Sequence, residues 1–334
     1  MTLHPSRHTP IVRPPRLRPG QTLRVIAPSR SLAIVPAPVR READRRIEQL
    51  GFRLSFGRHV DEEDRFGSSS LDARLEDLHD AFADPDVGGI LTAIGGFNCN
   101  QLLNHIDYGL IQRHPKIFCG YSDITAIQAA ILTQASVETY SGPHYSTFGM
   151  LRGGEYTIAS FLSLLTGSVQ QSVEPSAEWS DDSWYLDQEN RTFIPNPGPS
   201  VIREGVGEGI LVGGNLCTLN LLQGTRFMPP LRGAVVFLED DAGSNPMEFD
   251  RDLQSLMHLP DFPEIRGLII GRFQAQSRID VQTADAIVRT KSELPNVPVV
   301  CGMDIGHTSP IATLPMGGHA RLEAMGRSVR FTLA

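Results

Sequence analysis

In the first half of the chain, short apolar stretches alternate with longer stretches in which apolar residues recur every three or four positions. The first pattern is typical of buried strands and the second of amphipathic helices. Strands are predicted at 22–27, 89–94 and 116–119, and helices at 39–50, 71–82 and 123–134. Strands that alternate with helices at this pace predict a parallel sheet covered by helices.

The pattern changes between residues 168 and 205, where Ser, Glu, Asp, Pro and Asn are frequent. This composition predicts a linker or a long excursion between two domains. The segment also contains both tryptophans of the chain, Trp179 and Trp184. Because a plain linker gains nothing from two large aromatic side chains, we expect the segment to cover another part of the protein.

The last third of the chain predicts a second α/β domain with a more mixed sheet. Strands are predicted at 234–238, 267–271 and 297–302, a helix at 215–223 and a hairpin at 320–332. We therefore expect four regions along the chain. These are a flexible N-terminal arm (1–20), an N-terminal α/β domain (21–167), the inter-domain segment (168–205) and a β-rich C-terminal domain (206–334).

Composition argues against several classes of function. The chain has 334 residues and a net charge of -8, without a Lys- or Arg-rich run, so a nucleic acid polymer is not an expected partner. No apolar stretch approaches the roughly 20 residues that a membrane-spanning helix needs. Residues 1–20 lack the apolar region of a secretory signal. Together these features predict a cytoplasmic protein that does not bind membranes.

The four cysteines are far apart and form no Cys-x-x-Cys pair: Cys99, Cys119, Cys217 and Cys301. This spacing does not support a zinc site and predicts buried free thiols in a reducing compartment. Neither G-x-G-x-x-G nor G-K-[ST] follows a predicted strand, so the common nucleotide-cofactor motifs are missing. We expect neither a metal nor a cofactor.

The most informative local feature is a serine at the corner between a predicted strand and a predicted helix. The strand runs into Gly120-Tyr-Ser122, and the helix begins at Asp123. Free N–H groups and the positive dipole end of a helix stabilise an oxyanion at such a corner. The turn is similar to the nucleophile elbow G-x-S-x-G without its second glycine. Taken alone, it is explained better by Ser122 or Asp123 acting only as a helix N-cap.

A serine hydroxyl is a poor nucleophile unless a histidine, oriented by a carboxylate, accepts its proton. Among 10 histidines, His307 stands out because it lies in a loop after an apolar strand, although an ordinary surface histidine is an equal alternative. Glu239 ends another apolar strand and is the candidate carboxylate, with Asp240 and Asp241 as rivals. Three consecutive acids could also bind a metal, but no His or further acid joins them at a recognised ligand spacing.

Two glycines, Gly95 and Gly96, follow the strand predicted at 89–94. Glycine lets the backbone approach a ligand closely and turn an N–H group toward it. We expect the N–H groups of Gly96 and Asp123 to form an oxyanion hole. The alternative is a tight turn that needs glycine for its conformation alone.

Taken together, these segments resemble the LD-carboxypeptidase family of serine peptidases. The matching pieces are Ala27-Pro28-Ser29, Gly95-Gly96, Ile106-Asp107-Tyr108, Gly120 to Asp123, Gly142-Pro143, Gly213 to Leu216, Leu238 to Asp240 and Gly306 to Thr308 with Pro310. Each piece is short, but the ordered set is specific and spans most of the chain. The resemblance implies an N-terminal α/β domain, a C-terminal domain, an active site at their junction, no metal and frequent homodimers. It also implies a Ser-His-Glu triad, which falls on Ser122, His307 and Glu239.

The glycine turn distinguishes two branches of this family. Muropeptide carboxypeptidases usually have Arg-Gly-Gly-Tyr-Gly, whereas this chain has Ile94-Gly-Gly-Phe-Asn98, which is closer to the branch that resembles the microcin C immunity protein. In that branch, aromatic residues of the inter-domain loop stack on adenine, and Trp179 and Trp184 are the matching candidates. The alternative is that these tryptophans only anchor the loop. Asn98 and Asn215 are further candidates for binding the substrate.

Three hypotheses of function follow. The first is a serine peptidase that cleaves the amide bond of aminoacyl- or peptidyl-nucleotides in self-immunity or detoxification. The segment after Glu239 contains no Lys or Arg to pair an acidic substrate side chain, which favours neutral aminoacyl groups. The second is a muropeptide carboxypeptidase that releases the terminal D-Ala from cell-wall tetrapeptide. The third is an inactive module that binds a nucleotide-peptide.

Overall fold

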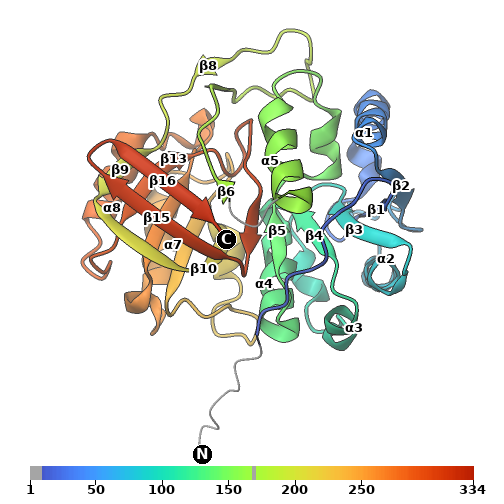
Figure 1. Cartoon of the computed structure of the whole chain (residues 1–334), viewed down its shortest axis with the longest axis horizontal. Helices are drawn as coiled ribbons and strands as arrows, with labels where there is room; N and C mark the ends of the chain where they lie inside the picture. The colour runs from blue at the N-terminus through green and yellow to red at the C-terminus, as the bar shows by residue number, and fades with distance from the viewer. Residues whose placement is uncertain (1–9, 168–170) are drawn as a thin grey trace, which may run out of the picture.

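Two β-sheets lie side by side in this computed structural model, which describes residues 10–167 and 171–334 (Figure 1). The first sheet has the strand order β14-β5-β4-β3-β1-β2. Its strands are β1 (Thr22–Ile26), β2 (Arg53–Phe56), β3 (Val87–Thr92), β4 (Ile117–Gly120), β5 (Thr139–Ser141) and β14 (Leu314–Met316). Strands β1 to β5 are parallel to their neighbours, and β14 is antiparallel to β5.

Helices cover both faces of the first sheet. Successive residues of a strand point to opposite faces, and here both sets are apolar, so each face needs a covering layer. On one face, Val25 packs with α1 (Ala37–Gln49) and α5 (Glu155–Thr166). On the other face, Ile26 packs with α2 (Leu71–Ala83) and α4 (Thr125–Ala135). The short helix α3 (Tyr108–Arg113) contacts α2 and α4. The predicted parallel sheet with its helices at about 39–50, 71–82 and 123–134 is therefore confirmed.

The second sheet is mixed and has the order β6-β16-β15-β10-β11-β12-β13-β9. Its strands are β6 (Gln171–Ser172), β9 (Ser200–Arg203), β10 (Gly205–Asn215), β11 (Ala234–Glu239), β12 (Gly267–Gly271), β13 (Val299–Met303), β15 (His319–Met325) and β16 (Ser328–Leu333). Strands β10 to β13 are parallel, and the others are antiparallel to their neighbours. Helices α6 (Leu216–Asn220), α7 (Pro246–Met257) and α8 (Val281–Arg289) follow β10, β11 and β12 in the chain.

The two-part α/β architecture predicted from the sequence is confirmed, but the two parts are more interwoven than the predicted regions suggest. Strand β14 comes from the C-terminal part and completes the first sheet. Within 168–205, β6 and β9 form opposite edges of the second sheet. The same segment contains the antiparallel pair β7 (Glu178–Trp179) and β8 (Ile194–Pro195), of which β8 is labelled near the top of the view in Figure 1.

Residues 10–20 differ from the expected flexible arm, because they pack against the N-terminal domain. Val12 forms a parallel bridge with Val137, and the Leu17 side chain is only 2% exposed within the apolar cluster of that domain. Residues 1–9 of the predicted arm lie outside the described residues. The sequence did not predict this packing, because the few apolar residues of the segment are spaced among Pro and Arg and form no periodic pattern.

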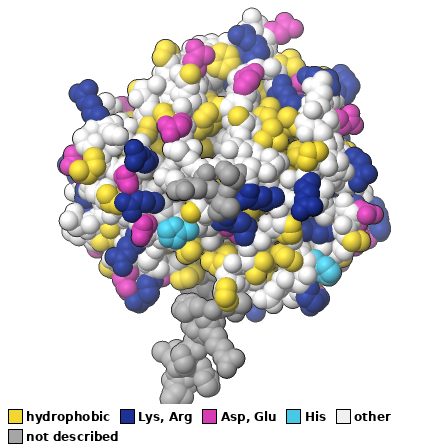
Figure 2. Space-filling model, viewed as in Figure 1, with side chains coloured by type: hydrophobic (Ala, Val, Ile, Leu, Met, Phe, Trp, Pro, Cys, Tyr) yellow, Lys and Arg dark blue, Asp and Glu magenta, His cyan; other side chains and the backbone are white. Residues whose placement is uncertain are grey.

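The distribution of surface charge and the burial of the cysteines can be compared with what composition predicts. On the face seen in Figure 2, Lys and Arg side chains are interspersed with Asp and Glu and do not form a basic stripe. Within the described ranges, no helix has both the length and the apolar character needed to cross a membrane. Cys99, Cys119 and Cys301 are buried free thiols, whereas Cys217 is exposed, in contrast to the prediction.

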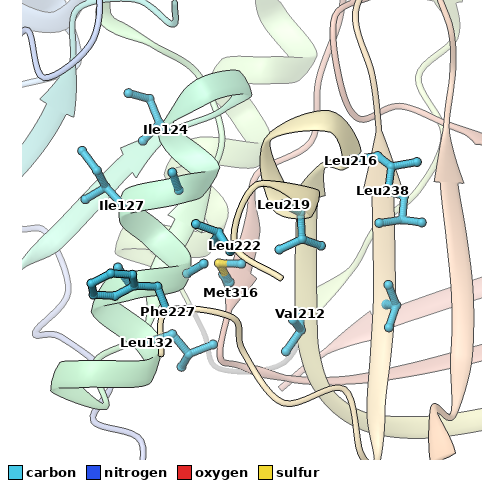
Figure 3. Close-up of a cluster of buried hydrophobic side chains, with 14 of the residues drawn as sticks. Ile124, Ile127, Leu132, Val212, Leu216, Leu219, Leu222, Phe227, Leu238 and Met316 are labelled. Carbon is cyan, nitrogen blue, oxygen red and sulfur yellow. The ribbon is translucent and has the colours of Figure 1, made fainter. Parts of the chain in front are cut away.

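The two sheets meet at a shared apolar cluster (Figure 3). Ile124 and Ile127 of the first domain face Val212 and Leu219 of the second, and Met316 of β14 lies between them. All five side chains are at most 2% exposed. Burying a side chain of this size stabilises a fold by about 1.5–3 kcal/mol, so this junction fixes the relative position of the two sheets.

We predict that Leu219→Ala lowers the free energy of unfolding by about 2–5 kcal/mol, because it removes a fully buried side chain and leaves a cavity at the junction. Denaturant-induced unfolding followed by circular dichroism measures the change. Leu221→Ala is the matched control, since Leu221 is 52% exposed and its loss should change the free energy by less than about 0.5 kcal/mol. Equal effects of the two substitutions would contradict the described junction.

Candidate active site

Ser122 lies at a sharp corner between a strand and a helix. Strand β4 ends at Gly120, a short 3₁₀ turn covers Ser122–Ile124, and α4 follows at once. Ser122 has a φ of 63°, in the left-handed region that side chains other than glycine rarely adopt. Such a conformation costs on the order of 1–3 kcal/mol and is found at functional turns, including the nucleophile elbow. The backbone therefore presents the Ser122 hydroxyl to the junction of the two sheets.

The structure brings the three predicted catalytic side chains together. His307 lies in the loop between β13 and β14, and Glu239 is the last residue of β11. His307 Nε2 is 3.1 Å from Ser122 Oγ. On its other side, His307 Nδ1 is 2.7 Å from Glu239 Oε2. A serine, a histidine and a carboxylate linked in this order can move a proton from the hydroxyl to the imidazole.

Gly306 lets the His307 loop approach Glu239 closely. Its φ is 104°, and a Cβ atom added there would lie 2.8 Å from Glu239 Oε2. Glu239 is 3% exposed, and its second oxygen, Oε1, has no hydrogen-bond donor among the described residues. His307 is thus the main partner of a buried carboxylate, which orients the ring and favours its protonated form.

The charge around His307 fits the role of a base. Burial by itself lowers the pKa of the imidazole, but the carboxylate of Glu239, followed by those of Asp241 and Asp240, outweighs burial and raises the pKa above 6.5. A raised pKa means that the site stabilises the imidazolium formed when a proton arrives from Ser122.

The candidate oxyanion donors, Gly96 and Asp123, lie beside Ser122. The N–H of neither residue donates a hydrogen bond to any other described residue. A Cβ atom added at Gly95 would lie 3.0 Å from Ser122 Oγ, which shows how closely the glycine turn approaches the serine. The Asp123 carboxylate accepts from Ser29 Oγ at 2.6 Å and from Cys99 N at 2.9 Å. It therefore helps to fix the turn.

A pocket of about 270 Å³ contains Ser122 and Gly96 in its wall. Asn215 also lines this pocket, where its Nδ2 donates to Asp240 Oδ1 at 3.2 Å. Asn98 does not line it. The Asn98 side chain instead accepts from Arg74 at 3.1 Å and donates to Ser68 Oγ at 2.9 Å. Of the two predicted asparagines, only Asn215 is therefore placed beside the serine.

Two models of one protein family match most of the chain. Residues 23–142 match the model of the LD-carboxypeptidase N-terminal domain, and residues 208–322 match that of the C-terminal domain. The chain belongs to the LD-carboxypeptidase family. A Bacillus subtilis protein with the name "Putative carboxypeptidase YocD" is 49% identical over 94% of this chain and 97% of its own length. The murein tetrapeptide carboxypeptidase of Pseudomonas aeruginosa is 27% identical over 90% of this chain and 92% of its own.

Solved structures of this family place the chain near MccF proteins. An MccF-like protein from Bacillus anthracis has a TM-score of 0.95 and 46% identity, covering 96% of this chain and 99% of that one. MccF in complex with glutamyl sulfamoyl guanosine has a TM-score of 0.88 and 26% identity, covering 97% and 98%. The microcin C7 self-immunity protein MccF of Escherichia coli is 29% identical over 86% of both chains.

The two tryptophans of this LD-carboxypeptidase family member lie in different surroundings. Trp179 lines a second pocket of about 500 Å³, and the Arg272 guanidinium lies 4.8 Å from the centre of its ring. Trp184 packs against the apolar cluster of the N-terminal domain and meets Tyr185 edge to face. Neither lines the pocket that contains Ser122. The anchoring alternative therefore describes Trp184, while Trp179 is placed at a cavity.

Sequence reasoning missed His144, which lies beside the candidate site. Its ring stacks on Tyr121 at 4.4 Å, and Tyr121 meets His307 edge to face at 5.2 Å. His144 Nδ1 is 2.7 Å from Thr92 Oγ1. Burial, together with the nearby His307, lowers the pKa of His144 to about 3, so this imidazole stays neutral. The only local signal was the Gly142-Pro143 pair before it.

Acidic and thiol groups near the site do not form a metal centre. Over the described ranges, no group of three or more His, Cys, Asp or Glu side chains could hold a metal ion. Asp240 is 4% exposed, and burial followed by the charge of Glu239 raises its pKa to about 7. Asp240 is therefore a buried acid whose hydrogen-bond partners in the described part of the chain, Asn215 and the Asp241 N–H, are not cationic.

We predict that NMR titration will show a raised pKa for the His307 imidazole and a lowered pKa for the His144 imidazole. The pKa of His307 should lie above 6.5, and Glu239→Gln should lower it, because the substitution removes the negative charge that stabilises the imidazolium. His144 should not become protonated above about pH 4 in either protein, which provides an internal control. A His307 pKa below 6.5 in the unmodified protein would contradict the described electrostatics.

Proposed function

We propose that this protein is a serine peptidase that cleaves the amide-type bond of aminoacyl- or peptidyl-nucleotides. One observation supports the proposal above the others. Ser122, His307 and Glu239 come from distant parts of the chain and are linked by contacts of 3.1 and 2.7 Å. The inactive-module hypothesis has less support, because it would place the hydroxyl beyond reach of the imidazole.

In the proposed reaction, His307 Nε2 accepts the proton of Ser122, and Oγ attacks the carbonyl carbon of the scissile bond. The N–H groups of Gly96 and Asp123 bind the oxyanion. Glu239 accepts a hydrogen bond from Nδ1–H and stabilises the imidazolium, which then gives its proton to the leaving nitrogen. Water, deprotonated by His307, attacks the acyl-enzyme, releases the acid product and regenerates the serine.

The substrate class is carried over from the MccF relatives. MccF has been solved with glutamyl sulfamoyl guanosine and with aspartyl sulfamoyl adenosine. In this chain, Trp179 offers a flat aromatic face at a cavity of a size usual for small-molecule sites. Stacking of a base on such a face stabilises binding by roughly 1–3 kcal/mol. A role in detoxifying microcin-type compounds is the biological form of this proposal.

A muropeptide carboxypeptidase is the second candidate, because a murein tetrapeptide carboxypeptidase aligns with nine-tenths of the chain. The chemistry is the same, and the leaving group is then D-Ala. Such a substrate has no base to stack, so this candidate needs neither tryptophan. Release of D-Ala from a cell-wall tetrapeptide, without cleavage of nucleotide conjugates, would favour it.

Replacing the proposed nucleophile tests the chemistry. Ser122→Ala should reduce kcat/KM on aminoacyl sulfamoyl adenosines by about 1,000-fold or more, because no other hydroxyl takes its place in the hydrogen-bonded series. Hydrolysis is measured by liquid chromatography of the released amino acid. Ser292→Ala, at an exposed serine, is the control and should keep full activity. Full activity of the Ser122 variant would overturn the peptidase proposal.

Replacing each tryptophan separates the two substrate candidates. Trp179→Ala should lower kcat/KM for nucleotide conjugates about 5- to 150-fold through a higher KM, while Trp179→Phe keeps most of the activity. Trp184→Ala should reduce thermal stability and leave kcat/KM unchanged, since Trp184 packs on the N-terminal core. If the Trp179 variant cleaves both substrate classes as well as the unmodified protein, stacking on this residue is excluded.

A further inference from the structure

The pocket that contains Ser122 has walls from both domains. Gly96, Phe97 and Ser122 line it on the side of the first sheet. Asn215, Asp240 and Ser244 line it on the side of the second sheet. Any substrate whose carbonyl carbon reaches Ser122 Oγ must place part of its structure in this space. The chemistry of these walls therefore selects the substrate.

The charge of the pocket is strongly one-sided. Four carboxylates line it, from Asp240, Asp241, Glu248 and Asp252. Arg251 is the one cationic side chain in the described lining, and its side chain is 74% exposed and lies 3.6 Å from Asp252. An acidic group of a substrate would be repelled here, whereas a cationic group would meet several carboxylates.

Of the four carboxylates, the deeply buried Asp240 is the one that a cationic ligand would stabilise most. The Asp240 residue is only 4% exposed. Its Oδ1 accepts hydrogen bonds from Asn215 Nδ2 at 3.2 Å and from Asp241 N at 3.0 Å. Among the described residues, no hydrogen bond reaches its second oxygen, Oδ2. Ser244, on the same wall, has a buried Oγ without a hydrogen-bond partner among the described residues. A buried polar atom of this kind is costly unless a ligand satisfies it.

We propose that this pocket binds an ammonium group on the acyl part of the substrate, with Asp240 as its principal partner. The proposal rests on the proposed peptidase function and names the substrate class of the same site. An ammonium has three N–H donors, and the same pocket offers it the Asp240 carboxylate and the unpartnered Ser244 Oγ as acceptors. It replaces the expectation of neutral acyl groups, which rested only on the lack of Lys and Arg after Glu239. The ammonium can belong to the α-amino group or to a side chain.

Binding to the Ser122→Ala protein tests the subsite without requiring catalysis. Calorimetry would compare lysyl, norleucyl and glutamyl sulfamoyl adenosine, whose side chains differ mainly in charge, and Nα-acetyl-norleucyl sulfamoyl adenosine, which lacks the α-ammonium. A side-chain site predicts that the lysyl compound binds about 10- to 100-fold more tightly than the norleucyl compound. An α-amino site predicts that acetylation weakens norleucyl binding by a similar factor. In either case the glutamyl compound should bind most weakly of the free amines.

Charge removal identifies the partner. Adding Asp240→Asn to the Ser122→Ala protein should abolish the preference for the ammonium-bearing compound, because the amide keeps the shape of the side chain and loses its charge. Asp86→Asn removes one charge from an exposed side chain outside the pocket and should leave the preference unchanged. Asp241→Asn, at a less buried position of the same pocket, should reduce the preference and serves if the Asp240 variant does not fold. Thermal unfolding checks the fold of each variant.

Hydrolysis by the unmodified protein separates failure of the subsite from failure of the function. Cleavage without any preference in binding would overturn the ammonium site and leave the peptidase proposal standing. A preference in binding that the Asp240 substitution removes, without cleavage, would support the site and overturn the peptidase. Equal binding of all four compounds, or no binding of any, would overturn the ammonium site.

Discussion

The contact between Ser122 and His307 joins two parts of the chain that belong to different sheets, and the candidate site depends on it. A hydrogen bond of this kind contributes only about 1 kcal/mol net, which is too little to hold two sheets in place. The apolar junction of α4 with β10 and α6 provides several side chains that each contribute more. The junction therefore decides the distance, and the hydrogen bond forms because the two groups are already within reach.

The end of β11 supplies carboxylates to two places. Consecutive residues of an extended chain point in opposite directions, so Glu239 reaches His307 while Asp240 faces the pocket. Both are buried, but among the described residues only Glu239 has a hydrogen-bond partner that can become cationic. Burial and the charge of Glu239 together raise the pKa of Asp240 to about 7. The two adjacent buried carboxylates repel each other. The His307 imidazole can compensate the charge of Glu239, and the proposed ammonium ligand would compensate that of Asp240.

Local patterns predicted most of the strands and helices, because each depends on a few adjacent residues, whereas the candidate triad followed only from the ordered set of segments that resembles the family. The strand, the turn and the helix around Ser122 are visible in the sequence, as is the apolar strand that ends at Glu239. Contacts between distant segments could not be predicted in this way. The packing of Leu17, the place of β14 in the first sheet and the stacking of His144 on Tyr121 all depend on tertiary structure. The two tryptophans looked equivalent in the sequence because composition does not show which one packs on a core.

The loop that contains His307 also explains why the two domains cannot be treated as independent. It begins at β13 in the second sheet and ends at β14 in the first. After His307, Ile311 N and Thr313 N donate to Thr157 Oγ1 and Ser160 Oγ of α5, both at 2.9 Å. Before β14, Ala312 N donates to Asp304 O at 2.7 Å.

Ser309 extends this connection to the inter-domain segment through a pair of hydrogen bonds with Ser180, of 2.7 and 2.9 Å. Ser180 directly follows Trp179, so the proposed base-stacking residue is linked to the loop that positions the imidazole. This pair of hydrogen bonds thus links the loop of the proposed general base, His307, to the segment of the proposed base-stacking residue, and the link requires no contact between His307 and Trp179 themselves.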